Sequence, residues 1–257
     1  MSDSRSGLPV AILIHGAWAG SWVWDQLTPL LERQGLRVLT PDMPGNPAHP
    51  APPEQISLQG CVDHVLGCCA GIAAPLILVG HSGGGVIATQ VAEHIAERVT
   101  GVVYIAGMML PSGLGFAELT AELREQEPAA AGISPYLQWS DDRQSSRVPT
   151  SALREIFLHD LPEDAAMAAA ERFCAQPEGS RALIPIWTQE RFGRLPRLYV
   201  EALRDRSVIL AAQRRMQALV PGADIASLDT GHVPQAAAPA AVADAILHFV
   251  RRQGVSP

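Results

Sequence analysis

The sequence has few positive charges and few aromatic side chains. Nineteen Lys and Arg stand against 26 Asp and Glu, which gives a net charge of -7, and aromatic residues make up 5% of the 257 positions. A negative net charge has the wrong sign for a surface that binds nucleic acid phosphates, and no basic run compensates for it. We therefore expect no nucleic acid partner.

Cysteine is also scarce. The four cysteines, Cys61, Cys68, Cys69 and Cys174, include a vicinal pair that does not form a disulfide easily. Since they match no zinc-ligand spacing, the sequence predicts reduced thiols in a cytoplasmic protein, with no metal site.

Long hydrophobic runs are absent as well. The first apolar stretch, residues 8–14, leads directly into His15 and Gly16. It is too short for the apolar core of a signal peptide or for a membrane span, so we expect no membrane association.

The chain does contain enough apolar material for one globular core. Apolar residues make up 47% of the sequence, which also has 22 glycines and 21 prolines. A chain of this length buries roughly 70–75% of its unfolded surface, so no metal or disulfide is needed to hold the core. The composition excludes a disordered chain, a collagen-like repeat and a small disulfide-rich scaffold.

Short apolar runs alternate with helical patterns in residues 1–110 and again in residues 196–257. This alternation is typical of parallel strands that crossover helices cover on both faces. The expected strands are residues 9–14, 37–40, 76–79, 101–106, 197–202 and 224–228, and the expected helices are residues 22–34, 57–70, 84–98, 208–219 and 239–252. Residues 111–195 show helical patterns, including 116–127 and 162–174, without a convincing strand. The sequence predicts an α/β core in two parts, 1–110 and 196–257, with a helical cap inserted at 111–195.

A candidate nucleophile follows the expected strand at residues 76–79. Gly80-His81-Ser82-Gly83-Gly84 fits the pattern G-x-S-x-G. Between a strand and a helix, this pattern predicts a sharp, strained turn that lifts the serine hydroxyl above the sheet and needs small residues on both sides. The N-terminus of the next helix favours negative charge beside Ser82.

A serine hydroxyl is a weak nucleophile at neutral pH, so Ser82 needs a histidine base. His232 lies in the loop after the last expected strand. The other histidines considered, His64, His94 and His248, fall in expected helices. His232 is therefore the candidate base.

The base in turn needs a carboxylate that orients it. Asp205 follows the strand at 197–202, at the carboxyl edge of the sheet where functional loops collect. Asp229, three residues before His232, is the alternative. Glu201 within a strand and Asp224 at the start of one are less able to reach His232, so we choose Asp205.

Acyl transfer also needs backbone donors for the oxyanion, each worth about 3 kcal/mol. The N–H of Gly83 directly follows the nucleophile. A second donor, the N–H of Ala17, is expected from the turn after the first strand, His15-Gly16-Ala17-Trp18, where Gly16 lets the backbone come close.

With these motifs, the sequence resembles the α/β-hydrolase superfamily, and within it the branch of hydroxynitrile lyases, plant methylesterases and related bacterial esterases. The resemblance rests on residues 15–22, on the motif around Ser82, on Tyr199-Val200 followed by Asp205, and on Gly231-His232. It covers nearly the whole chain. It implies a mostly parallel six-stranded sheet, the triad Ser82, His232 and Asp205, and an oxyanion hole formed by the backbone of Ala17 and Gly83.

The same resemblance separates two chemistries. The hydroxynitrile lyases of this branch have a threonine at the position of Gly16 and a lysine directly after the catalytic histidine, where this chain has Val233. An uncharged residue at 233 leaves no cation to hold departing cyanide, so hydrolysis is favoured. Dehalogenases and epoxide hydrolases of the superfamily have an aspartate at the elbow, and Ser82 argues against both.

We therefore expect an esterase that cleaves carboxylic esters of hydrophobic small molecules through an acyl-enzyme, without a metal or an organic cofactor, as a monomer or a homodimer. The pocket is expected between the sheet and the cap. Its expected lining is Gly16, Trp18, Met108, Met109, Trp139, Trp187 and Val233, with Leu137 and Phe157 as further candidates.

Other uses of the same residues stay open at this point. The triad alone does not distinguish an esterase from a lactonase, an amidase, a C–C hydrolase or a hydroxynitrile lyase. A ligand-binding receptor with a hydrolase fold and little turnover is the alternative outside enzymes.

Overall fold

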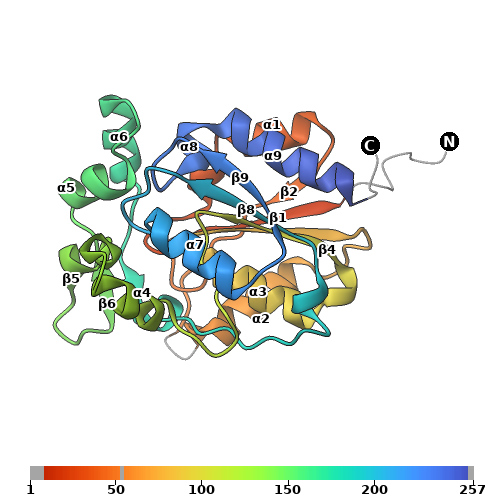
Figure 1. Ribbon diagram of the computed structural model, residues 1–257, viewed down its shortest axis with the longest axis horizontal. Coiled ribbons are helices and arrows are strands. Elements are labelled where there is room, and N and C mark those ends of the chain that lie inside the picture. The colour runs from red at the N-terminus through yellow and green to blue at the C-terminus, as the bar shows by residue number, and fades with distance from the viewer. Residues whose placement is uncertain (1–8, 53–54, 254–257) are drawn as a thin grey trace.

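A six-stranded parallel sheet forms the centre of the protein. The computed structural model describes residues 9–52 and 55–253, and in it the strands follow the order β2-β1-β3-β4-β8-β9 (Figure 1). The strands are β1 (Val10–Ile14), β2 (Arg37–Leu39), β3 (Leu76–His81), β4 (Val99–Ile105), β8 (Arg197–Ala202) and β9 (Ala223–Leu228). The predicted six-stranded sheet is confirmed.

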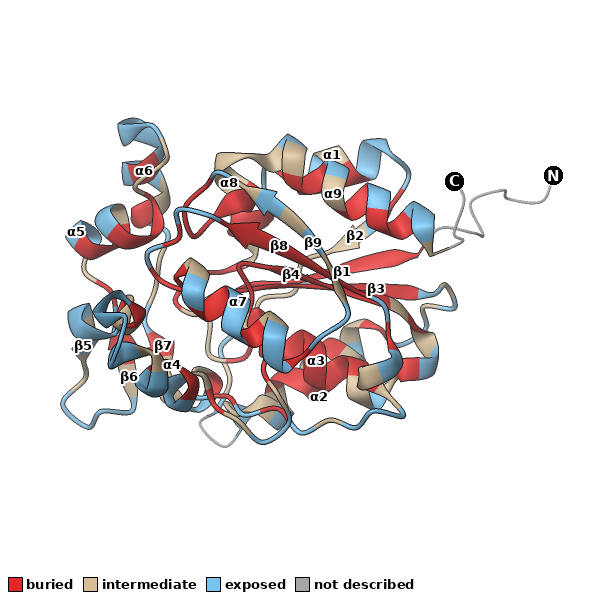
Figure 2. Ribbon diagram, viewed as in Figure 1, coloured by how far each residue is buried: buried red, intermediate tan, exposed pale blue. Residues whose placement is uncertain are grey.

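Helices cover the sheet on both faces (Figure 1). One face carries α2 (Leu58–Cys68), α3 (Gly84–His94) and α7 (Leu210–Leu219), and the other carries α1 (Thr28–Arg33), α8 (Pro234–Ala237) and α9 (Pro239–Arg252). Every residue of β1 and β3 is buried (Figure 2). Ile12 of β1 packs in the hydrophobic cluster of the first face, and Leu13 packs in that of the second. This burial on both faces explains why the strands read as continuous apolar runs.

The first helix is shorter than predicted. The structure replaces the helix expected at 22–34 by a 3₁₀ turn over Ser21–Trp24 and by α1, which begins at Thr28. Pro29 is the reason, because proline lacks the N–H that a continuous helix would need there but fits the first turn of a new one. Similarly, α3 ends at His94, and a separate 3₁₀ turn covers Ala96–Arg98.

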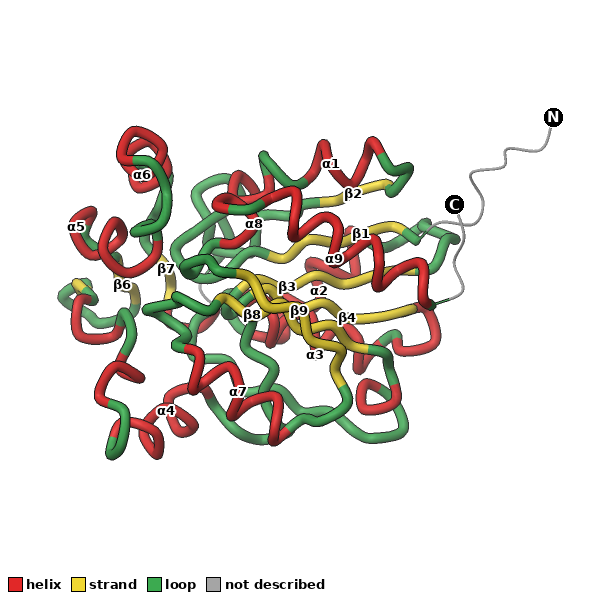
Figure 3. The backbone as a smooth tube through the Cα atoms, turned by 45° about the horizontal axis from the view of Figure 1, so that its top comes forward, coloured by secondary structure: helices red, strands yellow, loops and turns green. Residues whose placement is uncertain are grey.

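The chain between β4 and β8 forms a cap beyond the carboxyl ends of the strands, where the long loops gather (Figure 3). Its helices are α4 (Phe116–Arg124), α5 (Thr150–Ala152), a π-helical turn (Leu153–Phe157) and α6 (Glu163–Ala170). The cap also holds a small antiparallel sheet of β5 (Gln138–Trp139), β6 (Ser145–Arg147) and β7 (Gln176–Pro177). The expectation of a cap without strands is therefore wrong, because strands this short carry no readable alternation. The boundaries at 111 and 195 stay a prediction.

The cap packs directly on two loops of the core. Its hydrophobic cluster, which includes Ile133, Leu153 and Phe157, is completed by Trp18 and Val233, which follow β1 and β9. Over the two described ranges, no helix is both long enough and apolar enough to cross a membrane.

Two glycines allow β3 and α3 to meet at a sharp turn. A Cβ on Gly80 would lie 2.6 Å from the carbonyl oxygen of Gly84, and a Cβ on Gly84 would lie 2.3 Å from that of Ile14. Both contacts are with backbone, which cannot rotate away as a side chain can. The small residues that the motif requires are thus explained by steric contact.

We expect Gly84→Ala to lower the free energy of unfolding by about 1–3 kcal/mol, because the new methyl group forces the backbone of β1 and α3 apart. Gly67→Ala in α2 is the matched control, because a Cβ there meets nothing within 4 Å. The control should leave stability unchanged or raise it by up to about 1 kcal/mol. Urea denaturation of both variants tests the prediction, and equal stabilities would contradict it.

Candidate active site

Ser82 stands at the turn between β3 and α3 in a strained conformation. Its φ angle is 52°, in the left-handed region that non-glycine residues avoid. Its N–H donates to the carbonyl of Ile105 (3.3 Å), and its carbonyl accepts from the N–H groups of Gly85 (3.0 Å) and Met108 (2.8 Å). These bonds hold the backbone of Ser82, which lines the cavities described below.

Asp205 and His232 form a buried pair at the ends of β8 and β9. The imidazole Nδ1 of His232 lies 2.8 Å from Oδ2 of Asp205, and both side chains are almost fully buried. Oδ1 of Asp205 accepts from the N–H groups of Ser207 (2.7 Å) and Val208 (3.0 Å). Because an ionised carboxylate only accepts hydrogen bonds, Nδ1 of His232 is the protonated nitrogen and Nε2 is free to accept a proton.

The alternative acid, Asp229, does not reach His232. Its carboxylate is exposed and pairs with Arg204, with 2.9 Å between Oδ1 and the arginine Nε. The structure therefore places Asp205 rather than Asp229 against the imidazole.

The structure brings Ser82 and His232 to one small cavity. Both residues line a void of about 10 Å³, together with Trp18, Phe157 and Val233. No hydrogen bond joins the two side chains within the described chain. Such contacts are commonly loose before substrate binds and tighten in the substrate complex, so the arrangement fits a nucleophile and its base.

Two backbone N–H groups remain available beside Ser82. In the described part of the chain, the N–H groups of Ala17 and Gly83 have no hydrogen-bond acceptor, and both residues line the larger cavity. The neighbouring N–H of Trp18 is used, because it donates to Oε1 of Gln176 (3.1 Å). The geometry thus leaves the two predicted donors open to the cavity.

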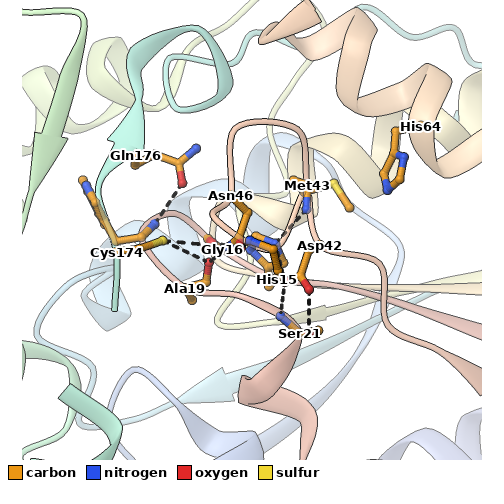
Figure 4. Close-up of polar contacts among 12 residues, drawn as sticks. His15, Gly16, Ala19, Ser21, Asp42, Met43, Asn46, His64, Cys174 and Gln176 are labelled. Carbon is orange, nitrogen blue, oxygen red and sulfur yellow. Dashed lines mark hydrogen bonds and ion pairs between the residues drawn. The ribbon is translucent and has the colours of Figure 1, made fainter. Parts of the chain in front are cut away.

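His15 fixes the loop that carries Ala17 (Figure 4). Its Nδ1 lies 2.8 Å from the carbonyl oxygen of Gly16, and its Nε2 accepts the N–H of Met43 (3.0 Å). With Nδ1 donating and Nε2 accepting, the ring is neutral, and burial lowers its pKa from the ordinary value of 6.5. Asp42, on the same loop as Met43, accepts from the N–H and hydroxyl of Ser21 (2.6 and 2.9 Å).

The cap holds the same loop from the other side. The N–H of Cys174 donates to the carbonyl of Trp18 (2.8 Å), and the indole N–H of Trp18 donates to the hydroxyl of Ser146 (3.2 Å). Together with Gln176, these contacts fix Trp18 at a φ of 60°. No local motif marks Ser146, Gln176 or the backbone contact of Cys174, because each of them meets a loop that is far away in the sequence.

His81 links the serine turn to the histidine loop. Its Nε2 lies 2.8 Å from the carbonyl oxygen of His232, so Nε2 carries the proton and Nδ1 does not. The two imidazole rings lie 4.9 Å apart. Burial, reinforced by the nearby imidazole of His232, lowers the pKa of His81 to about 3, which makes this ring a neutral donor near pH 7.

A cavity of about 330 Å³ opens above Ser82, between the core and the cap. Its core wall includes Gly16, Ala17, Trp18, Met43, Ser82, Gly83, Val86, Ile87 and Met108, and its cap wall includes Phe116, Thr120, Ile133, Gln176, Leu183 and Ile184. Arg181 also lines the cavity, but two hydrogen bonds of 2.6 Å tie its guanidinium to the carboxylate of Glu178. The wall is mainly apolar; Arg181 is neutralised by Glu178, and the other arginine of the lining, Arg124, is exposed.

Some predicted lining residues lie elsewhere. Gly16, Trp18 and Met108 line the large cavity, and Val233 and Phe157 line the small one. Met109 is fully buried in the core, and the indole of Trp187 packs on Phe192 and donates to the carbonyl of Leu110. Trp139 lies behind Arg181, with its ring 5.4 Å from the guanidinium, and Leu137 packs in the cap core. These four side chains fill packing positions instead of the cavity wall.

The fold and this arrangement define the class of protein: the chain belongs to the α/β-hydrolase family, whose sequence model matches residues 11–245. Its relatives include a pyrethroid hydrolase of Sphingobium wenxiniae, 30% identical over 246 residues that cover 93% of this chain and 86% of the relative. The esterase PIR7B of Oryza sativa subsp. japonica is 28% identical over 241 residues, which cover 88% of this chain and 89% of the relative.

A solved structure agrees with this assignment. The crystal structure of a pyrethroid hydrolase from Sphingobium faniae matches with a TM-score of 0.82 at 29% sequence identity, and the match covers 95% of this chain and 98% of that one. The similarity therefore includes both the sheet and the cap region.

We expect acid to destabilise the protein partly through His81. The unfolded chain takes up a proton on this residue below pH 6.5, whereas the folded protein does so only near pH 3, so stability falls as the pH falls through this window. When the pH is lowered from 8 to 5, the free energy of unfolding should fall in both proteins, but the fall should be about 2 kcal/mol smaller in His81→Gln than in the wild type. Urea denaturation at both pH values measures the difference. His248→Gln, at an exposed histidine, is the control, and equal losses in all three proteins would contradict the prediction.

Proposed function

We propose that the protein hydrolyses carboxylic esters of hydrophobic small molecules through an acyl-enzyme on Ser82. The observation that carries this proposal is that Ser82 lines two adjoining cavities, the small one together with His232 and the large one together with Ala17 and Gly83. The groups concerned are the hydroxyl of Ser82, the oriented imidazole of His232 and the two unpaired N–H groups of Ala17 and Gly83.

In the proposed mechanism, Nε2 of His232 takes the proton from the Ser82 hydroxyl as the oxygen attacks the ester carbonyl. The N–H groups of Ala17 and Gly83 stabilise the oxyanion. His232 then gives the proton to the departing alcohol, which leaves an acyl group on Ser82. Water, activated by the same imidazole, attacks this ester and releases the acid. Asp205 fixes the imidazole tautomer and stabilises the protonated ring.

The cavity supports a mainly apolar substrate of moderate size. A volume of about 330 Å³ is near the lower end of the range for small-molecule sites. Because Arg181 is paired with Glu178, it offers no free charge to a substrate carboxylate. The names of two relatives, a pyrethroid hydrolase and an esterase, agree with a hydrolytic reaction on an ester.

The structure also disfavours the lyase alternative. A Cβ on Gly16 would lie 2.8 Å from the Cβ of Ser82, so the threonine of the lyases does not fit here without a shift of the serine turn. Val233 is buried against the cap and supplies no cation. Ester, lactone and amide hydrolysis share the triad, and a substrate panel separates them.

The thiols support an intracellular setting for this reaction. All four cysteines are free, and burial raises the pKa of Cys61 to about 12, which makes its thiol unreactive. Free thiols are typical of a reducing compartment such as the cytoplasm.

Ser82→Ala should abolish both the burst and the turnover of p-nitrophenyl acetate and p-nitrophenyl butyrate, because no other hydroxyl stands at the turn.

We expect Asp205→Asn to lower kcat by about 10⁴-fold, since the amide selects the wrong imidazole tautomer. Stopped-flow release of p-nitrophenolate measures both effects.

Asp229→Asn is the matched control and should leave kcat within about threefold of the wild type, because this carboxylate is exposed and pairs with Arg204 on the surface. Loss of activity in Asp229→Asn but not in Asp205→Asn would overturn the assignment of the acid. Saturable ligand binding without acylation of the wild type would support a receptor instead.

A further inference from the structure

One short segment of the cap contacts both the loop that carries Asp205 and the loop that carries His232. The carbonyl of Glu155, in the π-helical turn, accepts from Nη1 of Arg206, the residue after Asp205 (3.0 Å). The ring of Phe157 lies over the imidazole of His232, with 4.8 Å between ring centres. π-helical turns are rare and are often found at functional sites.

Asp160, which follows this turn, makes the most direct contact with the histidine loop. Its Oδ2 accepts the N–H of Gly231, the residue before His232, at 2.6 Å. A Cβ on Gly231 would lie 2.7 Å from Oδ1 of Asp160 and 2.8 Å from Cε1 of His159, so the cap fits closely against this glycine. The requirement for glycine before the histidine is therefore set by the cap.

The role of Asp160 is not that of an ion-pair partner. Within the described residues, no cationic group lies within ion-pair distance of its carboxylate. Two arginines of the loop after β8 have other partners, because Arg204 pairs with Asp229 and Arg206 binds the carbonyl of Glu155. Oδ1 of Asp160 is buried and has no hydrogen-bond partner among the described residues. The bond from the N–H of Gly231 to Oδ2 is therefore the polar contact that this carboxylate makes.

The backbone around His232 is thus held at two adjacent points. His81 donates to the carbonyl of His232 from the serine side, and Asp160 accepts the N–H of Gly231 from the cap side. Loss of either contact frees the loop to rotate the imidazole away from Ser82, and misplacement of a reacting group by about 1 Å can cost about 100-fold in rate.

We propose that Asp160 is a positioning residue of the cap that holds the loop of His232, so that its imidazole faces Ser82. This inference rests on the proposed esterase function. It makes the cap part of the catalytic apparatus as well as a cover for the substrate.

Steady-state kinetics with p-nitrophenyl acetate, a substrate too small to fill the cavity, test the proposal. Asp160→Ala should lower kcat by about 10- to 100-fold with KM within twofold, and Asp160→Asn should recover most of the loss because its amide oxygen still accepts the N–H of Gly231. Asp141→Ala is the control, since Asp141 is an exposed cap aspartate without a hydrogen bond or ion pair among the described residues. Equal kcat in Asp160→Ala and Asp141→Ala, or a rise in KM alone, would overturn the proposal.

Gly231→Ala tests the same contact from the loop side. Its methyl group would displace Asp160, so this variant should show the same fall in kcat at unchanged KM. It also tests the contact if a thermal melt shows that Asp160→Ala is poorly folded. In a double-mutant cycle, the two substitutions should combine to less than the product of their separate effects. Fully multiplied effects would show that Asp160 does not act through Gly231.

Ser82→Ala in the same assay separates this inference from the proposed function. Activity in Ser82→Ala would contradict the proposed esterase mechanism. Loss of activity in Ser82→Ala together with unchanged activity in Asp160→Ala would contradict only the proposed role of Asp160.

Discussion

The hydrogen bond between Asp205 and His232 is the interaction on which the rest of the site depends. It joins the ends of two neighbouring strands, β8 and β9, and fixes which imidazole nitrogen carries the proton. Because both carboxylate oxygens of Asp205 are engaged, one by the imidazole and one by two backbone N–H groups, the carboxylate cannot rotate. The free Nε2 of the ring is then available to Ser82, and the sheet supplies the rigid frame that holds this geometry.

Strain is concentrated at the same edge of the sheet. Among the described residues, four non-glycine residues have positive φ angles; Ser82 and Ala106 directly follow β3 and β4, and Trp18 lies in the loop after β1. Such conformations cost energy and persist only where surrounding contacts impose them. Here the contacts come from both parts of the protein: the cap binds the backbone of Trp18, and neighbouring strand ends hold Ser82 and Ala106. The loop that carries Trp18 and the serine turn are therefore shaped by long-range hydrogen bonds.

The sequence predicted the parts of this site that obey local rules. The serine turn follows from glycine spacing after a buried strand, and the positions of His232 and Asp205 follow from their place after the last strands. The contacts of the cap could not be predicted in this way. Gln176 meets Trp18 across 158 positions, and Asp160 meets Gly231 across 71, so no local pattern records either pairing. The short cap strands could not be predicted because two or three residues show no period. The expectation that Trp139 and Trp187 line the pocket rests on their chemical type alone, whereas packing decides their positions.

The central claim is that Ser82 is the nucleophile and that His232 activates it. Mass spectrometry of the protein after reaction with a fluorophosphonate ester tests this most directly, since the reagent traps an activated serine as a covalent adduct. We expect one adduct per chain, located on Ser82, and little or no adduct when His232 is replaced by alanine. An adduct on another residue, or unchanged labelling of Ser82 in His232→Ala, would contradict it.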